Sequence, residues 1–277
     1  MAAIITLTTD FGLADGYVAA MKGVIMGINP EATLVDISHD IAPQNIPQAA
    51  FVLGTACPSF PEKTVHLVVV DPGVGTERQA LVLRTPSADF VAPDNGVLSY
   101  VIEPFSDGPL SGDSVDLTEM AAGLEAVAIA VPRFWRTPVS ATFHGRDIFA
   151  PVAGWLSRGL SLDSFGPALT RVTVLPLPRP RRAADGSLVG QVRHVDRFGN
   201  LITSITTADL PPAGMPLAVE VAGRRITGLS RSYAGGGGLL AVIGSSGYLE
   251  VAFLEGSAAD RLKAGVGDEV RLHNGQP

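Results

Sequence analysis

The apolar positions of the first 70 residues alternate between two patterns, short β-branched runs and longer stretches with helical spacing. The runs at 4–9, 33–37 and 65–70 are almost continuously apolar, as is typical of strands buried on both faces of a parallel sheet. Between them, residues 17–28 and 46–57 repeat apolar side chains near the helical period, and a proline follows each stretch closely. This pattern predicts two β-α-β units.

The alternation continues to about residue 174. Further strands are predicted at 80–84 and 90–92, and the last helix of this part is predicted at 147–158. Strands joined by crossover helices form a mostly parallel sheet. Residues 1–174 are therefore predicted to be a Rossmann-like α/β domain whose sheet has about seven strands.

A proline-rich stretch, Leu-Pro-Leu-Pro-Arg-Pro-Arg-Arg, begins at Leu175 and marks a change of pattern. Proline lacks an N–H donor and fixes φ, so this stretch is neither helix nor central strand, and a linker is predicted over 175–186. The remainder, 187–277, is predicted to be an all-β barrel domain, because turn residues separate its short β-rich runs. Those runs are 188–195, 201–205, 217–221, 239–243, 248–253 and 269–272.

Composition narrows the classes of function. The chain has 277 residues, of which 46% are hydrophobic, and this is enough for two buried cores. Its net charge of -7, with no run of Lys or Arg longer than two, argues against a nucleic-acid partner. No apolar run approaches the roughly 18 residues of a membrane span, so no membrane partner is expected. Cys57 is the single cysteine, which excludes an internal disulfide and favours a cytoplasmic location.

Asp10 directly follows the first predicted strand, in the sequence Thr-Thr-Asp-Phe-Gly. The carboxyl end of a parallel sheet is where such folds open their ligand crevice, and a carboxylate there can accept two hydrogen bonds from a ribose diol. An aspartate in this place can equally cap the turn or the following helix. The residues alone leave both interpretations open.

Asp71 follows another predicted strand and begins the sequence Asp-Pro-Gly-Val-Gly-Thr-Glu-Arg, which ends at Arg78. The glycine spacing is similar to that of a dinucleotide-binding loop, but Arg78 stands where such a loop needs a third small residue. A phosphate-binding role is therefore disfavoured. The loop can instead bring Asp71 and Arg78 together, either in an active site or as a structural ion pair.

His144 lies in the sequence Phe-His-Gly-Arg-Asp, immediately before the last predicted helix of the first domain. None of the other four histidines has a comparable setting. A lone histidine is usually structural. Combined with Asp71 and Arg78, however, His144 favours a catalytic group of three residues.

The predicted barrel domain offers a second candidate region, which begins at Asp196. The sequence Asp-Arg-Phe-Gly-Asn places an acid, the aromatic Phe198 and the amide of Asn200 in a tight turn between two predicted strands. Such a turn can grip a base and an amino group, although an ordinary Asx turn has the same kind of sequence. The stretch that starts at Ser245 allows the same two interpretations.

These motifs resemble those of the S-adenosyl-L-methionine (SAM) hydroxide adenosyltransferases, relatives of the adenosyl-fluoride and adenosyl-chloride synthases. The resemblance covers almost the whole chain and rests on 9–12, 71–78, 92–96, 143–147, 196–200 and 247–250. It implies hydrolysis of SAM by attack of water or hydroxide on the ribose C5′, which gives adenosine and L-methionine without a cofactor. It also implies an N-terminal α/β domain, a C-terminal β-barrel, and a homotrimer with active sites between neighbouring subunits.

The resemblance assigns a role to each matching residue. Asp71, Arg78 and His144 are expected to form the catalytic triad that activates water. Substrate binding is expected to involve Asp10 at the ribose hydroxyls, Phe143 beside the triad, Asn200 at the adenine edge, Phe198 and Tyr233 near the base, and Asp196 with Ser245 at the methionine end.

Asp71 favours water over a halide, because the halide-using relatives carry a tyrosine at this position. A halide-dependent adenosyl transferase remains the alternative enzyme, and a non-catalytic sensor of adenosine or SAM is the alternative of another class. The leaving group of the reaction is a neutral thioether that needs neither a proton nor a Lewis acid, so metal-independent catalysis is expected. Two departures from the family pattern, Gly244 and Leu254-Glu255, lie close to the expected adenine and methionine contacts.

Overall fold

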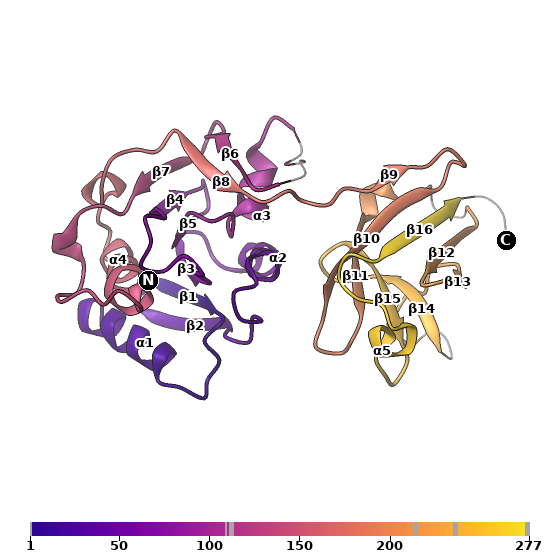
Figure 1. Cartoon of the computed structure of the whole chain (residues 1–277), viewed down its shortest axis with the longest axis horizontal. Helices are drawn as coiled ribbons and strands as arrows, with labels where there is room; N and C mark the ends of the chain where they lie inside the picture. Colours follow the sequence, from indigo (N-terminus) through magenta and orange to yellow (C-terminus); the bar gives the residue numbers. More distant parts are fainter. Residues whose placement is uncertain (1, 109, 111–113, 213–214, 235–237, 275–277) are drawn as a thin grey trace. The chain divides into compact units, whose positions relative to one another are not determined.

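The computed structural model describes residues 2–108, 110, 114–212, 215–234 and 238–274. The chain divides into two compact units, Met1–Leu177 and Pro178–Pro277, each with its own apolar core (Figure 1). The boundary between the units falls inside the proline-rich stretch. The linker bounds of 175–186 stay a prediction.

The first unit is built on a mixed sheet whose described strands follow the order β2-β1-β3-β5-β4-β7. The first four strands in this order are parallel, whereas β4 runs antiparallel to both β5 and β7. The prediction of a mostly parallel α/β sheet is therefore confirmed. The strands are β1 (Ile4–Thr9), β2 (Thr33–Ser38), β3 (Thr64–Val69), β4 (Ala80–Arg84), β5 (Ala88–Pro93) and β7 (Glu125–Ala128).

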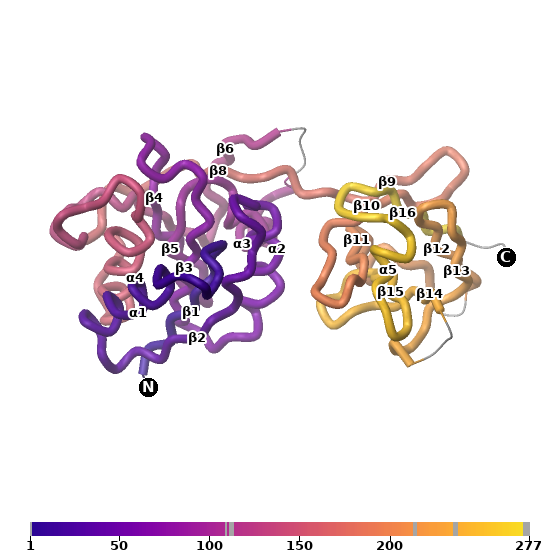
Figure 2. The backbone as a smooth tube through the Cα atoms, turned by 60° about the horizontal axis from the view of Figure 1, so that its bottom comes forward, coloured from indigo at the N-terminus to yellow at the C-terminus, as the bar shows by residue number. Residues whose placement is uncertain are grey.

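Helices cover both faces of this sheet. Figures 1 and 2 show α1 and α4 on one side of the strands and α2 and α3 on the other. In β3, Val65 and Leu67 pack with α1 and α4, whereas Val68 packs with α2 and α3, and this explains the almost continuous apolar run. The helices are α1 (Tyr17–Ile28), α2 (Ile46–Ala56), α3 (Ser99–Ile102) and α4 (Ala150–Ser157).

His66 is a buried ionisable side chain within β3. It is 1% exposed, its Nδ1 lies 2.7 Å from the Oγ1 of Thr6, and its ring stacks on Phe90 with 4.9 Å between centroids. Burial lowers the pKa of His66 to about 4. The folded chain therefore holds this imidazole neutral well below the pH at which a solvated histidine takes up a proton.

The first unit differs from the prediction in several places, one of them the short helix α3, which was not predicted. Its main sheet has six described strands rather than about seven, because β6 (Asp116–Glu119) and β8 (Arg171–Val174) pair only with each other. The strand β7 was missed, since it has four residues and no clear alternation. The last helix starts earlier than the predicted 147–158, with a π-helical turn at Gly145–Phe149 that leads into α4.

The second unit is an antiparallel, barrel-like sheet, so the prediction of an all-β fold is confirmed. Its described strands follow the order β13-β12-β16-β10-β11-β15-β14, and β9 also pairs with β10. The added helix α5 (Ala258–Leu262) is capped by the side chain of Ser257, which precedes it. The strands are β9 (Arg181–Arg182), β10 (Leu188–Val195), β11 (Leu201–Thr206), β12 (Leu217–Val221), β13 (Arg224–Thr227), β14 (Leu239–Ile243), β15 (Tyr248–Phe253) and β16 (Glu269–Asn274).

Within the described ranges, no helix has the length and apolar character needed to cross a membrane.

Candidate active site

The sheet of the first unit brings two of the predicted aspartates to one edge. β1 and β3 are parallel neighbours. β2 lies on the far side of β1, and β5 lies on the far side of β3, so the strand order reverses between β1 and β3. The crevice of an open α/β sheet forms at such a reversal of strand order, beside the carboxyl ends of the strands. Asp10 directly follows β1 and Asp71 comes two residues after β3, so both lie at this edge.

Arg78 holds the carboxylate of Asp71. Its Nε lies 2.9 Å from each carboxylate oxygen, and its Nη2 donates to Oδ2. Only 13% of the Arg78 side chain and 5% of the Asp71 side chain are exposed, so water screens this ion pair weakly. The guanidinium also lies over the ring of Phe149, 5.1 Å from its centroid.

His144 is the third member of this group, because its Nδ1 lies 3.0 Å from the Nη2 of Arg78. A guanidinium has donors only, so Nδ1 accepts this hydrogen bond and the neutral ring carries its hydrogen on Nε2. Burial and the charge of Arg78 lower the pKa of His144, against the opposing charges of Asp71 and Asp147. The structure thus brings Asp71, Arg78 and His144 into one connected trio, with a neutral imidazole.

The loop 136–147 positions His144 through the buried carboxylate of Asp147. Asp147 has no exposed surface, and it accepts hydrogen bonds from Nε and Nη2 of Arg146 at 2.7 and 2.9 Å. It also accepts one from the backbone N–H of Ser140 at 2.8 Å. A buried charge is stable only when it is paired and hydrogen-bonded, so these contacts fix the conformation of the loop.

The loop 71–78 packs directly against this second loop. Gly75 has a φ of 78°, and a Cβ built on it would lie 2.5 Å from the carbonyl oxygen of Ala141. Only glycine combines this left-handed backbone with such a close approach. The close contact brings the segment that carries Asp71 and Arg78 next to the segment that carries His144.

Asp10 is engaged by the neighbouring backbone. Its Oδ2 accepts a hydrogen bond of 2.7 Å from the N–H of Gln44, a residue with a φ of 65°. This contact is to a distant turn after β2 rather than to the turn or helix that follows Asp10, so the capping interpretation stays a prediction. The other carboxylate oxygen of Asp10 leaves the ribose interpretation open as a prediction.

A buried polar chain that the sequence did not reveal supports the Asp10 loop. His39 is 5% exposed. Its Nδ1 lies 2.8 Å from the Oγ1 of Thr9, and its Nε2 lies 2.9 Å from the Oδ1 of Asp36. The carbonyl of His39 also accepts from the N–H of Gly12. The only signal in the sequence was a histidine just after the second predicted strand, and such a signal is too common to single out.

Phe143 belongs to a small aromatic cluster at the same edge of the sheet. Its ring lies 5.8 Å from that of Phe11 and 5.1 Å from that of Tyr17, both in edge-to-face geometry. Tyr17 is 47% exposed, so the cluster presents an aromatic surface to solvent. Aromatic surfaces of this kind are suited to hold an apolar part of a ligand.

The second unit has a pocket of about 530 Å³. Four of the five substrate-binding residues that were predicted in this unit line it, whereas Ser245 lies exposed in the turn between β14 and β15. A volume of this size fits a small ligand, and a mostly apolar wall with a few polar groups is typical of such sites. The lining residues are Asp196, Phe198, Asn200, Tyr233, Leu240, Ala252, Phe253, Leu254, Glu255 and Gly256.

Asp196 organises the turn at one wall of this pocket. Its Oδ1 accepts from the N–H groups of Phe198 and Asn200, each at 2.9 Å, and its Oδ2 accepts from the side-chain amide of Asn200 at 2.8 Å. The Asx-turn interpretation is therefore correct at the level of the backbone. The turn also leaves Phe198 77% exposed, as an aromatic face beside the pocket.

Tyr233 and Glu250 form a second polar group at the pocket. The Tyr233 hydroxyl donates a hydrogen bond of 2.6 Å to Glu250, a carboxylate that is only 5% exposed. Partial burial and this bond raise the pKa of Tyr233 to about 12. Burial also raises the pKa of Glu250, and the charge of Asp196 adds to this rise while the bond from Tyr233 opposes it.

Over the described residues, no group of three or more His, Cys, Asp or Glu side chains is arranged to hold a metal ion.

Comparison with known proteins gives consistent matches over both units. Residues 5–166 match the SAM hydroxide adenosyltransferase N-terminal domain, and residues 190–271 match the C-terminal domain of the same family. The chain is 38% identical to the (R)-S-adenosyl-L-methionine hydrolase of Salinispora tropica, over 98% of each sequence. A fluorinase of Nocardia brasiliensis is more distant, at 28% identity over 97% of each sequence. An uncharacterized conserved protein from Thermotoga maritima has a similar crystal structure, with a TM-score of 0.84, 36% identity and coverage of 97% and 99% of the two chains.

Proposed function

The chain belongs to the SAM hydroxide adenosyltransferase family, and from this premise we propose that it hydrolyses SAM to adenosine and L-methionine. The observation that carries the proposal is the trio in which Arg78 contacts both Asp71 and His144. The trio joins a fixed positive charge, a carboxylate and a neutral imidazole at the carboxyl edge of the sheet. These are the groups needed to form and hold a hydroxide-like nucleophile.

The reaction places its demand on the nucleophile. Attack of a water oxygen on the ribose C5′ forms a C–O bond and breaks the bond from C5′ to the sulfonium sulfur. The sulfur leaves with the electron pair as the neutral thioether of methionine, so the leaving group requires no proton. Water is a weak nucleophile and must lose a proton, and a positioned general base contributes about 10²–10⁴-fold to such a step.

The hydrogen bonds of Arg78 assign a part to each member of the trio. With Nδ1 accepting from Arg78, His144 offers its Nε2–H to the attacking oxygen. The fixed charge of Arg78 lowers the cost of a hydroxide-like oxygen beside it. Among the described residues, Oδ1 of Asp71 accepts from Arg78 alone, which leaves a lone pair for the proton of water and supports Asp71, rather than His144, as the base.

The pocket of the second unit is the binding site for the adenosine portion. Phe198 and Tyr233 provide aromatic faces for the purine, and the side-chain amide of Asn200 provides polar contacts at its edge. Asp196 and Ser245 serve the methionine portion, and Asp10 with Phe143 serves the ribose from the first unit. The family resemblance further leads us to propose a homotrimer in which neighbouring subunits complete each other's sites.

The proposed enzyme works in the cytoplasm and needs no cofactor. Its single cysteine fits a reducing compartment. The neutral leaving group removes the usual need for a Lewis acid.

Incubation of the purified protein with SAM in ¹⁸O-labelled water tests the proposal. The expected products are adenosine with the label in its 5′-hydroxyl and an equal amount of L-methionine, with or without added chloride or fluoride. A 5′-halogenated nucleoside in place of adenosine would instead identify a halide-dependent transferase. Tight binding of SAM with no product would identify a sensor.

A further inference from the structure

The turn 94–96 adjoins both ends of the loop that carries Asp71 and Arg78. This turn follows β5 directly, and its sequence is Asp-Asn-Gly. The residue that precedes it is Pro93, which has no N–H to donate to a neighbouring strand. Beyond Pro93, groups of the turn donate hydrogen bonds instead.

Two hydrogen bonds connect the turn to the ends of loop 71–78. The side-chain Nδ2 of Asn95 donates to the carbonyl of Val70, the residue before Asp71, at 2.9 Å. The backbone N–H of Asp94 donates to the carbonyl of Gln79, the residue after Arg78, also at 2.9 Å. The two ends of the loop are thus fixed to one short turn, and the distance between them is set from outside the loop.

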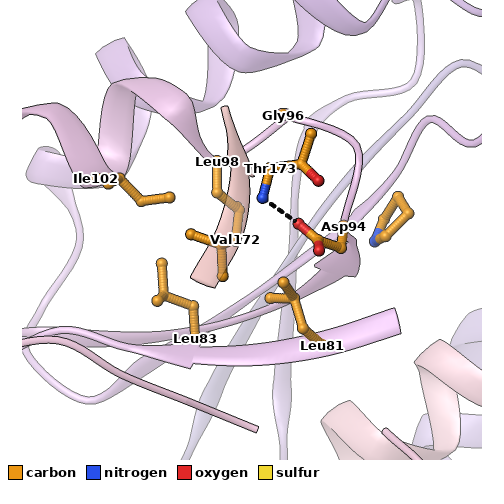
Figure 3. Close-up of a pocket in the computed structure, with 9 residues that line it drawn as sticks. Leu81, Leu83, Asp94, Gly96, Leu98, Ile102, Val172 and Thr173 are labelled. Carbon is orange, nitrogen blue, oxygen red and sulfur yellow. Dashed lines mark hydrogen bonds between the residues drawn. The ribbon is translucent and has the colours of Figure 1, made fainter. Parts of the chain in front are cut away.

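The turn is itself fixed by a different segment of the first unit. The Oδ1 of Asp94 accepts a hydrogen bond of 2.7 Å from the N–H of Thr173 in β8, as Figure 3 shows. Gly96 has a φ of 91°, and a Cβ built on it would lie 2.8 Å from the side chain of Leu175. Figure 3 also shows apolar side chains, among them Leu98 and Val172, around the Asp94 contact. The turn therefore has little freedom to move.

We propose that Asn95 is a positioning residue for the hydrolytic reaction, which holds loop 71–78 in the conformation that lets Arg78 contact both Asp71 and His144. The loop contains two glycines, and the hydrogen bonds that its backbone N–H groups donate within it are at the long end of the range, at 3.1 to 3.3 Å. Contacts at its ends therefore help to set its backbone conformation. A displacement of about 1 Å at reacting groups can cost about 100-fold in rate.

Asn29 offers a matched control for a test of Asn95. Each asparagine is half-buried, donates with Nδ2 over 2.9 Å, and accepts with Oδ1 from the N–H two residues later. The partner of Asn29 is Ser157, at the C-terminal end of α4. Asn95→Asp and Asn29→Asp remove one Nδ2 donor each, preserve side-chain size and add the same charge, although the lost bond ends on a carbonyl in one case and on a hydroxyl in the other.

Two measurements on the full-length protein decide between positioning and a merely structural role. The first is steady-state SAM hydrolysis, where Asn95→Asp is expected to lower kcat about 10- to 100-fold with KM changed less than about 3-fold. The second is titration of the His144 ring, followed by NMR without substrate. In Asn95→Asp this titration is expected to move to higher pH, because the histidine loses burial and the nearby charge of Arg78, the two causes that lower its pKa. Asn29→Asp is expected to match the wild type in both.

The inference rests on the proposed function but fails separately from it. If the wild type releases no adenosine from SAM, the proposed function is wrong, and the NMR titration alone decides whether Asn95 positions the trio. If the wild type is active, Asn95→Asp must change both readouts, and a change in neither or in only one overturns the inference. Should Asn95→Asp not fold, as judged by circular dichroism, Asn95→Ser removes the long amide without adding a charge and takes its place.

Discussion

Acidification should lower the free energy of unfolding of the first unit through protonation of His66. The substitution His66→Phe should remove this pH dependence. The imidazole of His66 is 1% exposed between Thr6 and Phe90, and burial lowers its pKa to about 4. In the unfolded chain a histidine titrates near 6.5. Between these two values the unfolded chain binds a proton that the folded chain does not. The stability that His66 contributes is thus fully present above about pH 6.5 and is lost as the pH falls toward 4.

The size of this effect follows from the separation of the two pKa values. Each pH unit in this interval costs about 1.4 kcal/mol of unfolding free energy, so the loss between pH 7 and pH 4 is about 3 kcal/mol. His66→Phe keeps an aromatic ring against Phe90 but leaves the Thr6 hydroxyl without its partner, which costs about 1 kcal/mol at pH 7. The wild type should therefore be the more stable protein at pH 7 and the less stable one at pH 4.

Urea unfolding at pH 7, 5.5 and 4 measures this reversal. The fluorescence of Trp135 and Trp155 reports on the first unit, because both tryptophans of the chain lie in it. Other titrating groups are common to the two proteins and cancel in the difference between them. If that difference is the same at pH 7 and pH 4 to within about 0.5 kcal/mol, then His66 is not held neutral by burial and the reasoning is wrong.

Three substitutions test the proposed site. Arg78→Lys should lower kcat about 100-fold or more, because an ammonium cannot make a bidentate contact with Asp71 and also reach the imidazole. Steady-state assays measure this loss, and an unchanged affinity for adenosine is the control for an intact binding site. Asn200→Leu should raise the Kd for adenosine about 10-fold in calorimetry, and an unchanged Kd would remove this residue from the nucleoside site. Gly244→Ala should weaken adenosine binding about 5-fold or more, since its Cβ would lie 1.7 Å from an oxygen of Glu250 and displace that buried carboxylate. An adenosine Kd equal to that of the wild type would contradict this prediction.

The sequence predicted elements well where the periodicity was strong, and poorly where strands were short. Ile4–Thr9, Tyr17–Ile28 and Leu188–Val195 have the predicted bounds, because their apolar patterns are long and end in clear turn residues. Glu125–Ala128 was not found, since four residues show too little alternation. Its antiparallel pairing, like that of Ala80–Arg84, depends on where the chain returns to the sheet, which periodicity does not encode.

The candidate site shows the same division between local and distant information. Asp71 and Arg78 were found because both flank one glycine-rich loop, and their contact follows from that spacing. The roles of His39 and Asn95 were not predicted, although 92–96 contributed to the resemblance, since their partners lie 30 and 25 residues away in the chain. The contacts of these two residues depend on which strands become neighbours, and the strand order is known only from the folded structure. A spaced motif reveals the groups that do chemistry more readily than the groups that hold them.

The division of the chain into two units has a consequence for how this kind of protein can change over generations. The proposed groups that prepare the nucleophile belong to residues 1–177, and the proposed nucleoside pocket belongs to residues 178–277. Each unit has its own core, so a substitution in one leaves the packing of the other intact. Selection can therefore exchange the attacking group by small changes in the first half while the second half continues to recognise the same nucleoside. Substitutions that alter the attack on the ribose and substitutions that alter purine recognition can thus accumulate in different halves of one gene.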